Sequence, residues 1–341
     1  MADRVKKIIE AFDQAKAPNL FLWSLLVVGK KTHQVEEMEI HTRKSGRETA
    51  PFVGPNLSGT FLGRKEFQIK SFKAPHIKPY KVAAANDLFK INFGSHAYAT
   101  DMNQAVGNAM NEDLKHLDTT ITRKELAMLG ELMSTGKISI KGKGVSREAI
   151  GYGTDAENIE TLTGSDMWDQ ATSDPLGDIE RWRDLVLEKT GIAIDSIVMT
   201  PTAKRAFLGH EDLKDKLKIT QPDLVRINPR NLGDGASFLG TIPELNMDIY
   251  SYIDWYEDDA GIKKSVLPEG GVLACRSKTV TQHYGAIAQK KSDDSPRQIF
   301  VGSRIPKIWG KGDNDYIRLS AAPLPVVHDA DGFVFSTVVS A

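Results

Sequence analysis

The chain has 341 residues and a mass of 37.6 kDa, enough for one large or two ordinary domains with a substantial core. Its 44 Lys and Arg nearly balance 45 Asp and Glu, whereas a dedicated nucleic-acid-binding protein is usually clearly basic. A single cysteine, Cys275, excludes an internal disulfide and any zinc site that requires several cysteines.

The N-terminal residues are predicted to form an arm. An amphipathic helix is expected at 3–16, with one apolar face at helical spacing made of Val5, Ile8, Ile9 and Phe12. Pro18 should end it, because proline cannot continue the hydrogen-bond ladder. The apolar run from Leu20 to Val28 is too short for a membrane span of about 20 residues, yet it carries more apolar surface than an isolated arm can hide. The charged opening predicts no signal peptide.

A strand is expected at 31–41, followed by an extended loop. From Thr42 to Pro79 the chain is rich in glycine and proline, and compact domains rarely contain such loops unless the loop has a role of its own. Between His41 and Lys90 ten Lys or Arg oppose three Asp or Glu, a net charge of +7. Between Gly151 and Thr190 the balance is reversed, at three against ten, a net of −7. The two blocks could meet within one molecule, meet between copies, or form two separate solvated faces.

A long helix is the strongest predicted element. Apolar residues recur every three to four positions from Met102 to Met133, Asp101 is a suitable N-cap, and Gly136 is well placed to terminate the helix. About 34 residues of helix would extend about 50 Å. A helix of this length exceeds a small domain and is expected to lie across a surface.

The remaining elements are shorter and mixed. We expect a hairpin at 137–150, helices at about 179–187 and from 201, and strands at 196–200, 247–255, 263–266, 271–275 and 298–301. The last segment, 316–341, is predicted to form two strands that are broken at 329–332.

Candidate catalytic patterns are weak. Four carboxylates, Asp254, Glu257, Asp258 and Asp259, could ligate Mg²⁺ or Ca²⁺ in a metal-dependent hydrolase, but they lie where a hairpin must turn. The glycine-rich stretch 233–240 lacks the lysine of a phosphate-binding loop. Cys275 lies in an apolar strand-like run and is predicted to be a buried, inert thiol. No catalytic residue, metal ligand or cofactor is predicted.

The basic loop is the alternative candidate for a site, because single-strand binders combine basic charge with aromatic stacking platforms. Its aromatic residues are interleaved with basic ones: Phe61, Phe67, Phe72 and Tyr80 with Arg64, Lys65, Lys70, Lys73, Lys78 and Lys81. A two-stranded arm that faces a neighbouring protein surface would give the same alternation. The near-neutral chain favours this second interpretation over a nucleic-acid-binding protein that uses loop 41–90.

Three stretches and their order carry a resemblance to a known family. They are Glu66-Phe67 through Pro75, Lys78 and Pro79; Gly261 to Pro268 after the acidic turn; and Ser320 to Leu324 through Asp329, Asp331, Phe333 and Val334. Over essentially its whole length the chain resembles the lambda-like capsid protein E family of tailed bacteriophages, whose members have the Hong Kong 97 phage capsid fold.

The resemblance implies an α+β fold and a major capsid protein, not an enzyme. It implies an N-terminal arm at 1–40, an extended E-loop at 41–90, a peripheral domain with a spine helix and hairpin at 91–174, an axial domain at 175–315, and C-terminal strands at 316–341 that return to the peripheral and axial sheets. The expected assembly is an icosahedral shell of hexamers and pentamers around double-stranded DNA. It would be built in the host cytoplasm and become part of the virion.

The resemblance also implies partners. These are further copies of the chain, a scaffolding protein, a portal, a decoration protein and packaged double-stranded DNA that is contacted non-specifically; no membrane is expected. Contacts between copies are predicted to join basic loop residues to acidic residues of a neighbour, and the candidates are Arg64, Lys65, Lys70, Lys73, Asp166 and Asp169.

Overall fold

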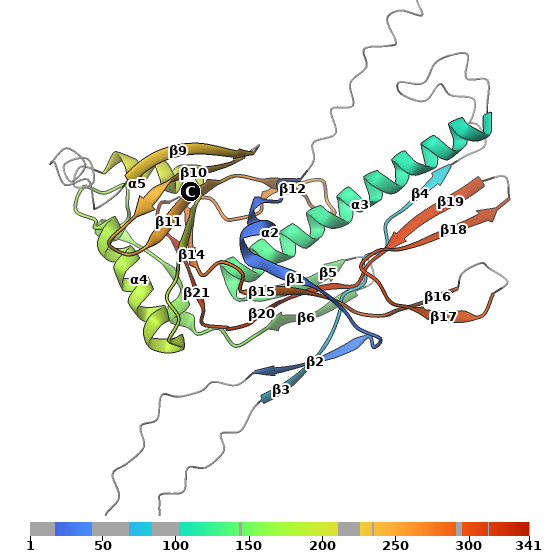
Figure 1. Cartoon of the computed structure of the whole chain (residues 1–341), viewed down its shortest axis with the longest axis horizontal. Helices are drawn as coiled ribbons and strands as arrows, with labels where there is room; N and C mark the ends of the chain where they lie inside the picture. Colours follow the sequence, from blue (N-terminus) through green and yellow to red (C-terminus); the bar gives the residue numbers. More distant parts are fainter. Residues whose placement is uncertain are drawn as a thin grey trace, which may run out of the picture.

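The computed structural model is an elongated molecule in which helices and many short strands are mixed (Figure 1). It describes residues 18–42, 68–83, 102–142, 145–210, 226–233, 235–290, 295–312 and 314–340. The predicted helix at 3–16, the N-cap Asp101 and most of the extended loop lie outside the described residues.

A mixed seven-stranded sheet forms one end of the molecule. Its strand order is β7-β21-β14-β8-β11-β10-β9. The bounds are Ile159–Thr161 for β7, Phe333–Thr337 for β21, Gly271–Cys275 for β14, Ser196–Met199 for β8, Met247–Tyr252 for β11, Ala236–Ile242 for β10 and Arg226–Gly233 for β9. The central strands β14 and β8 are buried at every position, as expected of strands covered on both faces.

Helices cover both faces of this sheet. Because successive side chains of a strand point to opposite faces, Ile197 and Met199 pack with helices α4, Pro175–Thr190, and α5, Pro201–Gly209. Val198, between them, packs toward helices α2, Phe21–Leu26, and α3, Met102–Thr135. The alternation therefore divides the main core into two layers on either side of the sheet.

Local signals fix the ends of α4. The Asp174 carboxylate accepts a hydrogen bond from the Gly177 N–H at 3.1 Å, and Pro175 occupies the first turn. At the other end Gly191 adopts φ +77°, in the left-handed region, and its N–H donates to the Leu187 carbonyl at 2.9 Å. The apolar face packs its tryptophan, Trp182, against Trp168, with ring centroids 5.8 Å apart.

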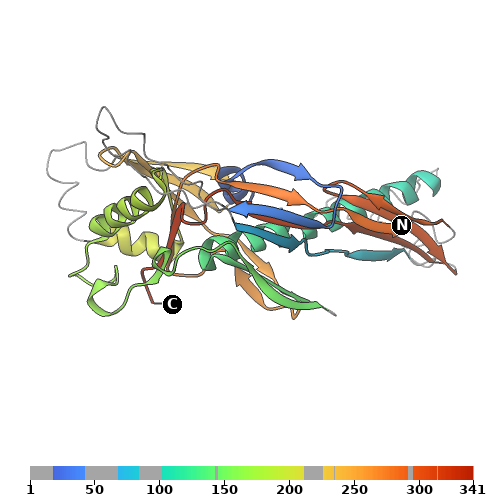
Figure 2. The ribbon, with the colours of Figure 1, turned by 90° about the horizontal axis from the view of Figure 1, so that it is seen from below.

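The predicted long helix is confirmed. Helix α3 has 34 residues and crosses the molecule from the seven-stranded sheet to its far end (Figures 1 and 2). It ends at Thr135, and the following Gly136 adopts φ +68° and donates its N–H to the Leu132 carbonyl at 2.8 Å. Residues 126–129 and 132–133 are buried as the helix approaches the sheet.

Smaller sheets line the helix. A sheet of order β1-β15-β20 joins Val27–Thr32, Val280–Tyr284 and Pro323–Val327, and an antiparallel sheet of order β18-β19-β4 joins Ile305–Lys311, Asn314–Ser320 and Tyr80–Ala83. Four two-stranded ribbons complete the described part of the fold: β2 and β3, Glu37–Thr42 and Gln68–Lys73; β5 and β6, Lys137–Gly142 and Val145–Gly151; β12 and β13, Trp255–Glu257 and Lys263–Ser265; and β16 and β17, Ile287–Lys290 and Arg297–Phe300.

The apolar run at the start of the arm differs from the prediction. It forms α2 and then β1, and its residues Leu22 and Leu26 are fully buried in the core of their own chain. The expectation that this run cannot bury itself is wrong for these residues, because β1 pairs in parallel with the remote strand β15 and brings α2 onto the body. Leu20 and Val28 remain exposed.

The C-terminal segment has three strands where two were predicted. Strand β19 ends at Ser320, and after Ala321 and Ala322 the chain continues as β20 in a different sheet, followed by β21. The sequence between β19 and β20 is apolar and carries no glycine or charged turn, so the change of sheet leaves no turn signal. At this change of sheet, Ala321 forms an isolated antiparallel β-bridge with Ile77.

Two histidines from remote segments meet where β1 lies on β15. His33 Nε2 is 2.7 Å from His283 Nδ1, and the rings are stacked with centroids 4.9 Å apart. Partial burial, together with the positive charge of His33 and Lys31, lowers the pKa of His283 from 6.5 to about 4.

This depressed pKa predicts a loss of stability in acid. In the unfolded chain His283 binds a proton near its ordinary pKa of 6.5, whereas in the folded chain it does so only near pH 4. The contribution of neutral His283 to the free energy of unfolding is therefore fully present above pH 6.5 and is lost as the pH falls toward about 4. The half-exposed site screens the effect, and we expect about 1 kcal/mol. Urea denaturation at neutral pH and near pH 4.5 checks this: the His283→Gln variant should lose less stability on acidification than the parent. Equal losses would contradict it.

Candidate inter-subunit surfaces

A two-stranded ribbon projects from the body at the base of the predicted E-loop (Figure 1). Strands β2 and β3 are antiparallel, with Glu37 opposite Lys73 and Thr42 opposite Gln68. Among the described strands neither pairs with a further neighbour, so each leaves a row of backbone N–H and C=O groups open. The ribbon is anchored where Met38 and Ala74 are buried. An open ribbon of this kind is a template for contact with another chain.

The structure describes two of the four basic residues that were predicted to contact a neighbour, Lys70 and Lys73. Arg64 and Lys65 lie outside the described residues, and Lys70 lies in β3 opposite Ile40. Lys73 Nζ is 2.9 Å from Glu36 Oε2, within its own chain. Lys73 and then His76 hydrogen-bond to the Glu36 carboxylate and lower its pKa. Lys73 is therefore already paired at the foot of the ribbon.

The acidic candidates are exposed on the side of the seven-stranded sheet. Asp166 closes a short 3-10 turn, Gly164–Asp166, and Asp169 follows it. Their carboxylates accept hydrogen bonds at 3.3 Å from the neighbouring Ser165 and Gln170, and no described cation forms an ion pair with either. The described residues show no contact between these aspartates and Lys73.

Other carboxylates of the acidic segment are neutralised within it. Arg181 donates to both oxygens of Glu160, at 3.0 and 2.8 Å, and to Asp178 at 3.2 Å. The hydrogen bond with Glu160 raises the pKa of Arg181 against the opposing effect of burial. Asp166 and Asp169 are thus better placed than Glu160 to meet a cation from another molecule.

A further surface was missed by sequence reasoning. On the β18-β19-β4 sheet Trp309 stacks on Tyr316, with centroids 5.2 Å apart and planes 14° apart, and Lys307 and Arg318 lie over the Trp309 ring. Tyr80, 59% exposed, extends this face on the neighbouring strand β4. Aromatic and arginine side chains of this kind are enriched at the centres of protein interfaces. The alternation of Lys307 with Trp309 and of Tyr316 with Arg318 was the available signal.

Comparison with known proteins decides what these surfaces belong to. The profile of the family described as phage major capsid protein E matches residues 4–338. The chain belongs to this family. It is a structural protein that forms the shell of a phage virion, and the predicted resemblance is confirmed.

Solved structures agree with this capsid fold. A crystal structure assigned as a prophage capsid protein of Escherichia coli CFT073 is 17% identical, with a TM-score of 0.68 over 99% of this chain and 98% of that one. The capsid of a native GTA particle is 10% identical, with a TM-score of 0.50 over 97% and 94% of the two chains. The comparison with curated proteins gives no match.

The acidic turn of the capsid protein has a structural role. The Asp258 carboxylate accepts hydrogen bonds from the N–H groups of Ala260 and Ile262, both at 2.9 Å, and pairs with Lys264 at 2.8 Å. The hydrogen bond from Lys264 is the main cause of its lowered pKa. Among the described residues no group of three His, Cys, Asp or Glu could hold a metal ion. Asp258 thus closes the β12–β13 hairpin, as a turn residue would.

Two further predictions concern residues that the fold uses internally. Cys275 is completely buried, and burial raises the pKa of its thiol, as expected of an inert side chain. Phe72 of the proposed nucleic-acid platform packs against Tyr152 at 5.6 Å, and Lys81 pairs with Asp113 at 2.7 Å. Phe61 and Phe67 lie outside the described residues.

No described helix is long and apolar enough to cross a membrane.

Proposed function

We propose that the capsid protein assembles into hexamers and pentamers of an icosahedral shell that encloses double-stranded phage DNA. The observation that carries this proposal is the β2–β3 ribbon, which projects from the body at the base of the E-loop and leaves a row of backbone N–H and C=O groups open along each strand. A neighbour can cover these groups, and obligate interfaces of this kind commonly bury about 2,000 Å² or more.

The axial and peripheral domains would correspond to the two ends of the molecule. The seven-stranded sheet with α4 and α5 would form the axial domain at the centre of each hexamer or pentamer, and α3 would be the spine of the peripheral domain. Strands β16 to β18 fall within the predicted axial domain at 175–315, but β16 to β19 lie toward the far end of α3 in Figure 1, so we group these strands with the peripheral domain instead. The E-loop at 41–90 would reach neighbouring copies.

Partners and place of assembly are part of the same proposal. Assembly would start in the host cytoplasm on a scaffolding protein, incorporate a portal and end with a decoration protein on the outer surface. Packaged DNA would be contacted without sequence preference, and a chain with a net charge of −1 would attract its phosphates only weakly.

Within the shell, we propose that Arg64, Lys65 and Lys70 of one copy face Asp166 and Asp169 of a neighbour. The support is electrostatic: the loop block carries +7, the acidic block −7, and the two aspartates are exposed without an ion pair among the described residues. Lys73 could join this contact only by leaving Glu36.

Charge reversal tests the contact. The double variant Asp166→Lys with Asp169→Lys should lower the assembled fraction about tenfold, because like charges across an interface are strongly unfavourable. Sedimentation and electron microscopy give the measurement. Asp184→Lys is the matched control, since its side chain is 71% exposed in the same acidic segment, and it should assemble normally. Adding Arg64→Glu and Lys65→Glu should restore shells; failure of this rescue, with the control intact, would refute the pairing.

A further inference from the structure

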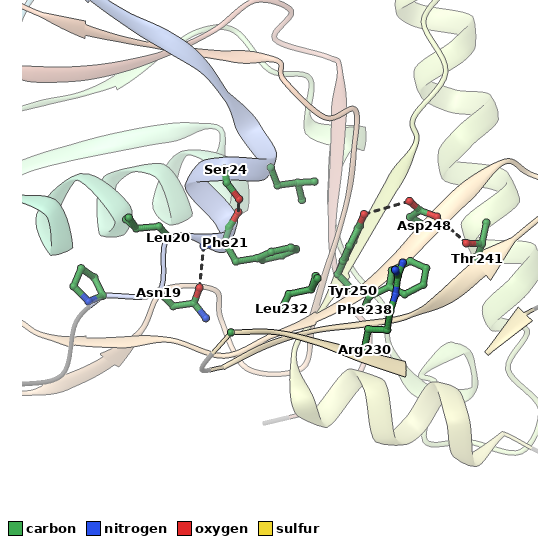
Figure 3. A pocket seen from close by; sticks show the side chains of 13 residues that line it. Asn19, Leu20, Phe21, Ser24, Arg230, Leu232, Phe238, Thr241, Asp248 and Tyr250 are labelled. Atoms are coloured by element: carbon green, nitrogen blue, oxygen red, sulfur yellow. Dashed lines mark hydrogen bonds between the residues drawn. The ribbon is translucent and has the colours of Figure 1, made fainter. Parts of the chain in front are cut away.

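An open groove lies between the start of α2 and the edge strands of the seven-stranded sheet. Its volume is about 840 Å³. Figure 3 shows Leu20 and Phe21 on one side and Leu232, Phe238 and Tyr250 on the other. Its floor is aromatic: Tyr250 lies 5.1 Å from Phe21 and 5.5 Å from Phe238 between ring centroids.

The groove suits an apolar occupant. Leu20 is 51% exposed and Leu232 48% exposed, and both border an aromatic cluster in which Phe238 is buried while Phe21 and Tyr250 are only half-buried. The polar side chains are already engaged: Asp248 accepts from Thr241 at 2.8 Å and from Tyr250 at 3.2 Å. The guanidinium of Arg230 lies over the Phe238 ring at 5.1 Å. An occupant would thus gain mainly by covering apolar surface.

The chain itself leads into this groove. Pro18 lines it, and 17 residues precede Pro18. Asn19 fixes the direction of entry, because its Oδ1 accepts from the Phe21 N–H at 2.9 Å and its N–H donates to Asp254 at 3.2 Å. Residues 17–20 separate the helix predicted at 3–16 from α2, and a connection of about two to five residues is the length that joins two antiparallel helices.

We propose that the apolar face of residues 3–16, made of Val5, Ile8, Ile9 and Phe12, docks in this groove of its own chain. Lys16 is two residues from Pro18, a reach of at most about 7 Å, so the segment is held beside the groove at an effective concentration in the millimolar range. A segment from another copy would have to compete with this local concentration. The docking requires no second molecule and is independent of the proposed shell geometry.

A cysteine pair tests the docking in the full chain. Oxidised Phe12→Cys with Leu232→Cys should form an intrachain disulfide, and the native Cys275 does not interfere because it is fully buried. The control pair is Phe12→Cys with Ile299→Cys, whose partner position is 69% exposed on β17 at the other end of the molecule (Figure 1). We expect at least about tenfold more intrachain product from the first pair, as the effective concentrations imply. Non-reducing electrophoresis and mass spectrometry separate the products.

Two results would overturn the proposal. Disulfide-linked dimers from the first pair would assign the groove to a second copy, and equal yields from both pairs would leave the segment undocked. A second measurement is the rate at which Leu232→Cys alone reacts with a maleimide. Adding Ile9→Asp and Phe12→Asp should raise this rate about tenfold, with no change for Ile299→Cys, because charged residues cannot stay on an apolar floor. An unchanged rate at Leu232→Cys also contradicts the docking.

Discussion

Replacing Arg304 by methionine should lower the free energy of unfolding by about 3–5 kcal/mol, the usual cost of leaving one partner of a buried ion pair alone. Arg304 donates from Nη1 and Nη2 to the two carboxylate oxygens of Glu125, at 2.7 and 3.0 Å, and from Nε to Asp118 at 2.6 Å. Glu125 is only 2% exposed, so without Arg304 its carboxylate would be a buried charge with little solvent to stabilise it. Both acids belong to α3, so this cluster joins that helix to the start of β18.

Urea denaturation of the purified protein measures this effect, and two variants serve as controls. Arg181→Met removes an arginine whose side chain is 49% exposed, and its loss should cost at most about 1 kcal/mol. The double variant Arg304→Met with Glu125→Leu removes both buried charges and should recover much of the lost stability. Equal costs for the two single arginine variants would show that the buried cluster has no special role.

Gly130→Ala should lower the free energy of unfolding by about 1–3 kcal/mol, as overpacking does. A Cβ at Gly130 would lie 2.2 Å from the Val266 carbonyl oxygen, which is a backbone atom that cannot rotate away. Alanine is favoured over glycine inside a helix by about 1 kcal/mol, so the clash must exceed this gain. Val266 directly follows β13, and α3 crosses the backbone there at Gly130. An added methyl group would therefore push the helix away from Val266.

The control for this substitution is another glycine in a helix. Gly209→Ala in α5 meets no atom within 4 Å, and it should change stability by less than about 1 kcal/mol. Thermal and urea denaturation of both variants give the comparison. If Gly130→Ala proves as stable as the parent, the close approach of α3 to Val266 is wrong.

The sequence predicted elements whose signals are local. The apolar spacing of α3 and the glycine after it were sufficient to find 34 residues of helix. Helix α4 was expected at about 179–187 and spans Pro175–Thr190, so its apolar stretch was found while its capped ends at Asp174 and Gly191 were missed. Burial of Cys275 was also predictable from its apolar strand. The Asp258 turn followed from the turn-forming character of its neighbours.

Pairings between remote segments could not be predicted in this way. Val27–Thr32 lies against Val280–Tyr284, and nothing in either stretch specifies the other, so the self-burial of Leu22 was missed. The ion pairs could not be predicted for the same reason. Lys73 contacts Glu36 only because β3 pairs with β2, and neither sequence segment specifies this pairing. The sequence therefore predicts the candidate contact surface only as two blocks of opposite charge, while the partner of each side chain depends on tertiary structure.

Electron microscopy of the purified full-length protein, as its concentration is raised, tests the shell most directly. We expect closed icosahedral particles, with density for the β2–β3 ribbon of each subunit resting on the adjoining one. A sample that stays a 37.6 kDa monomer at every concentration, with and without phage assembly partners, would contradict the account.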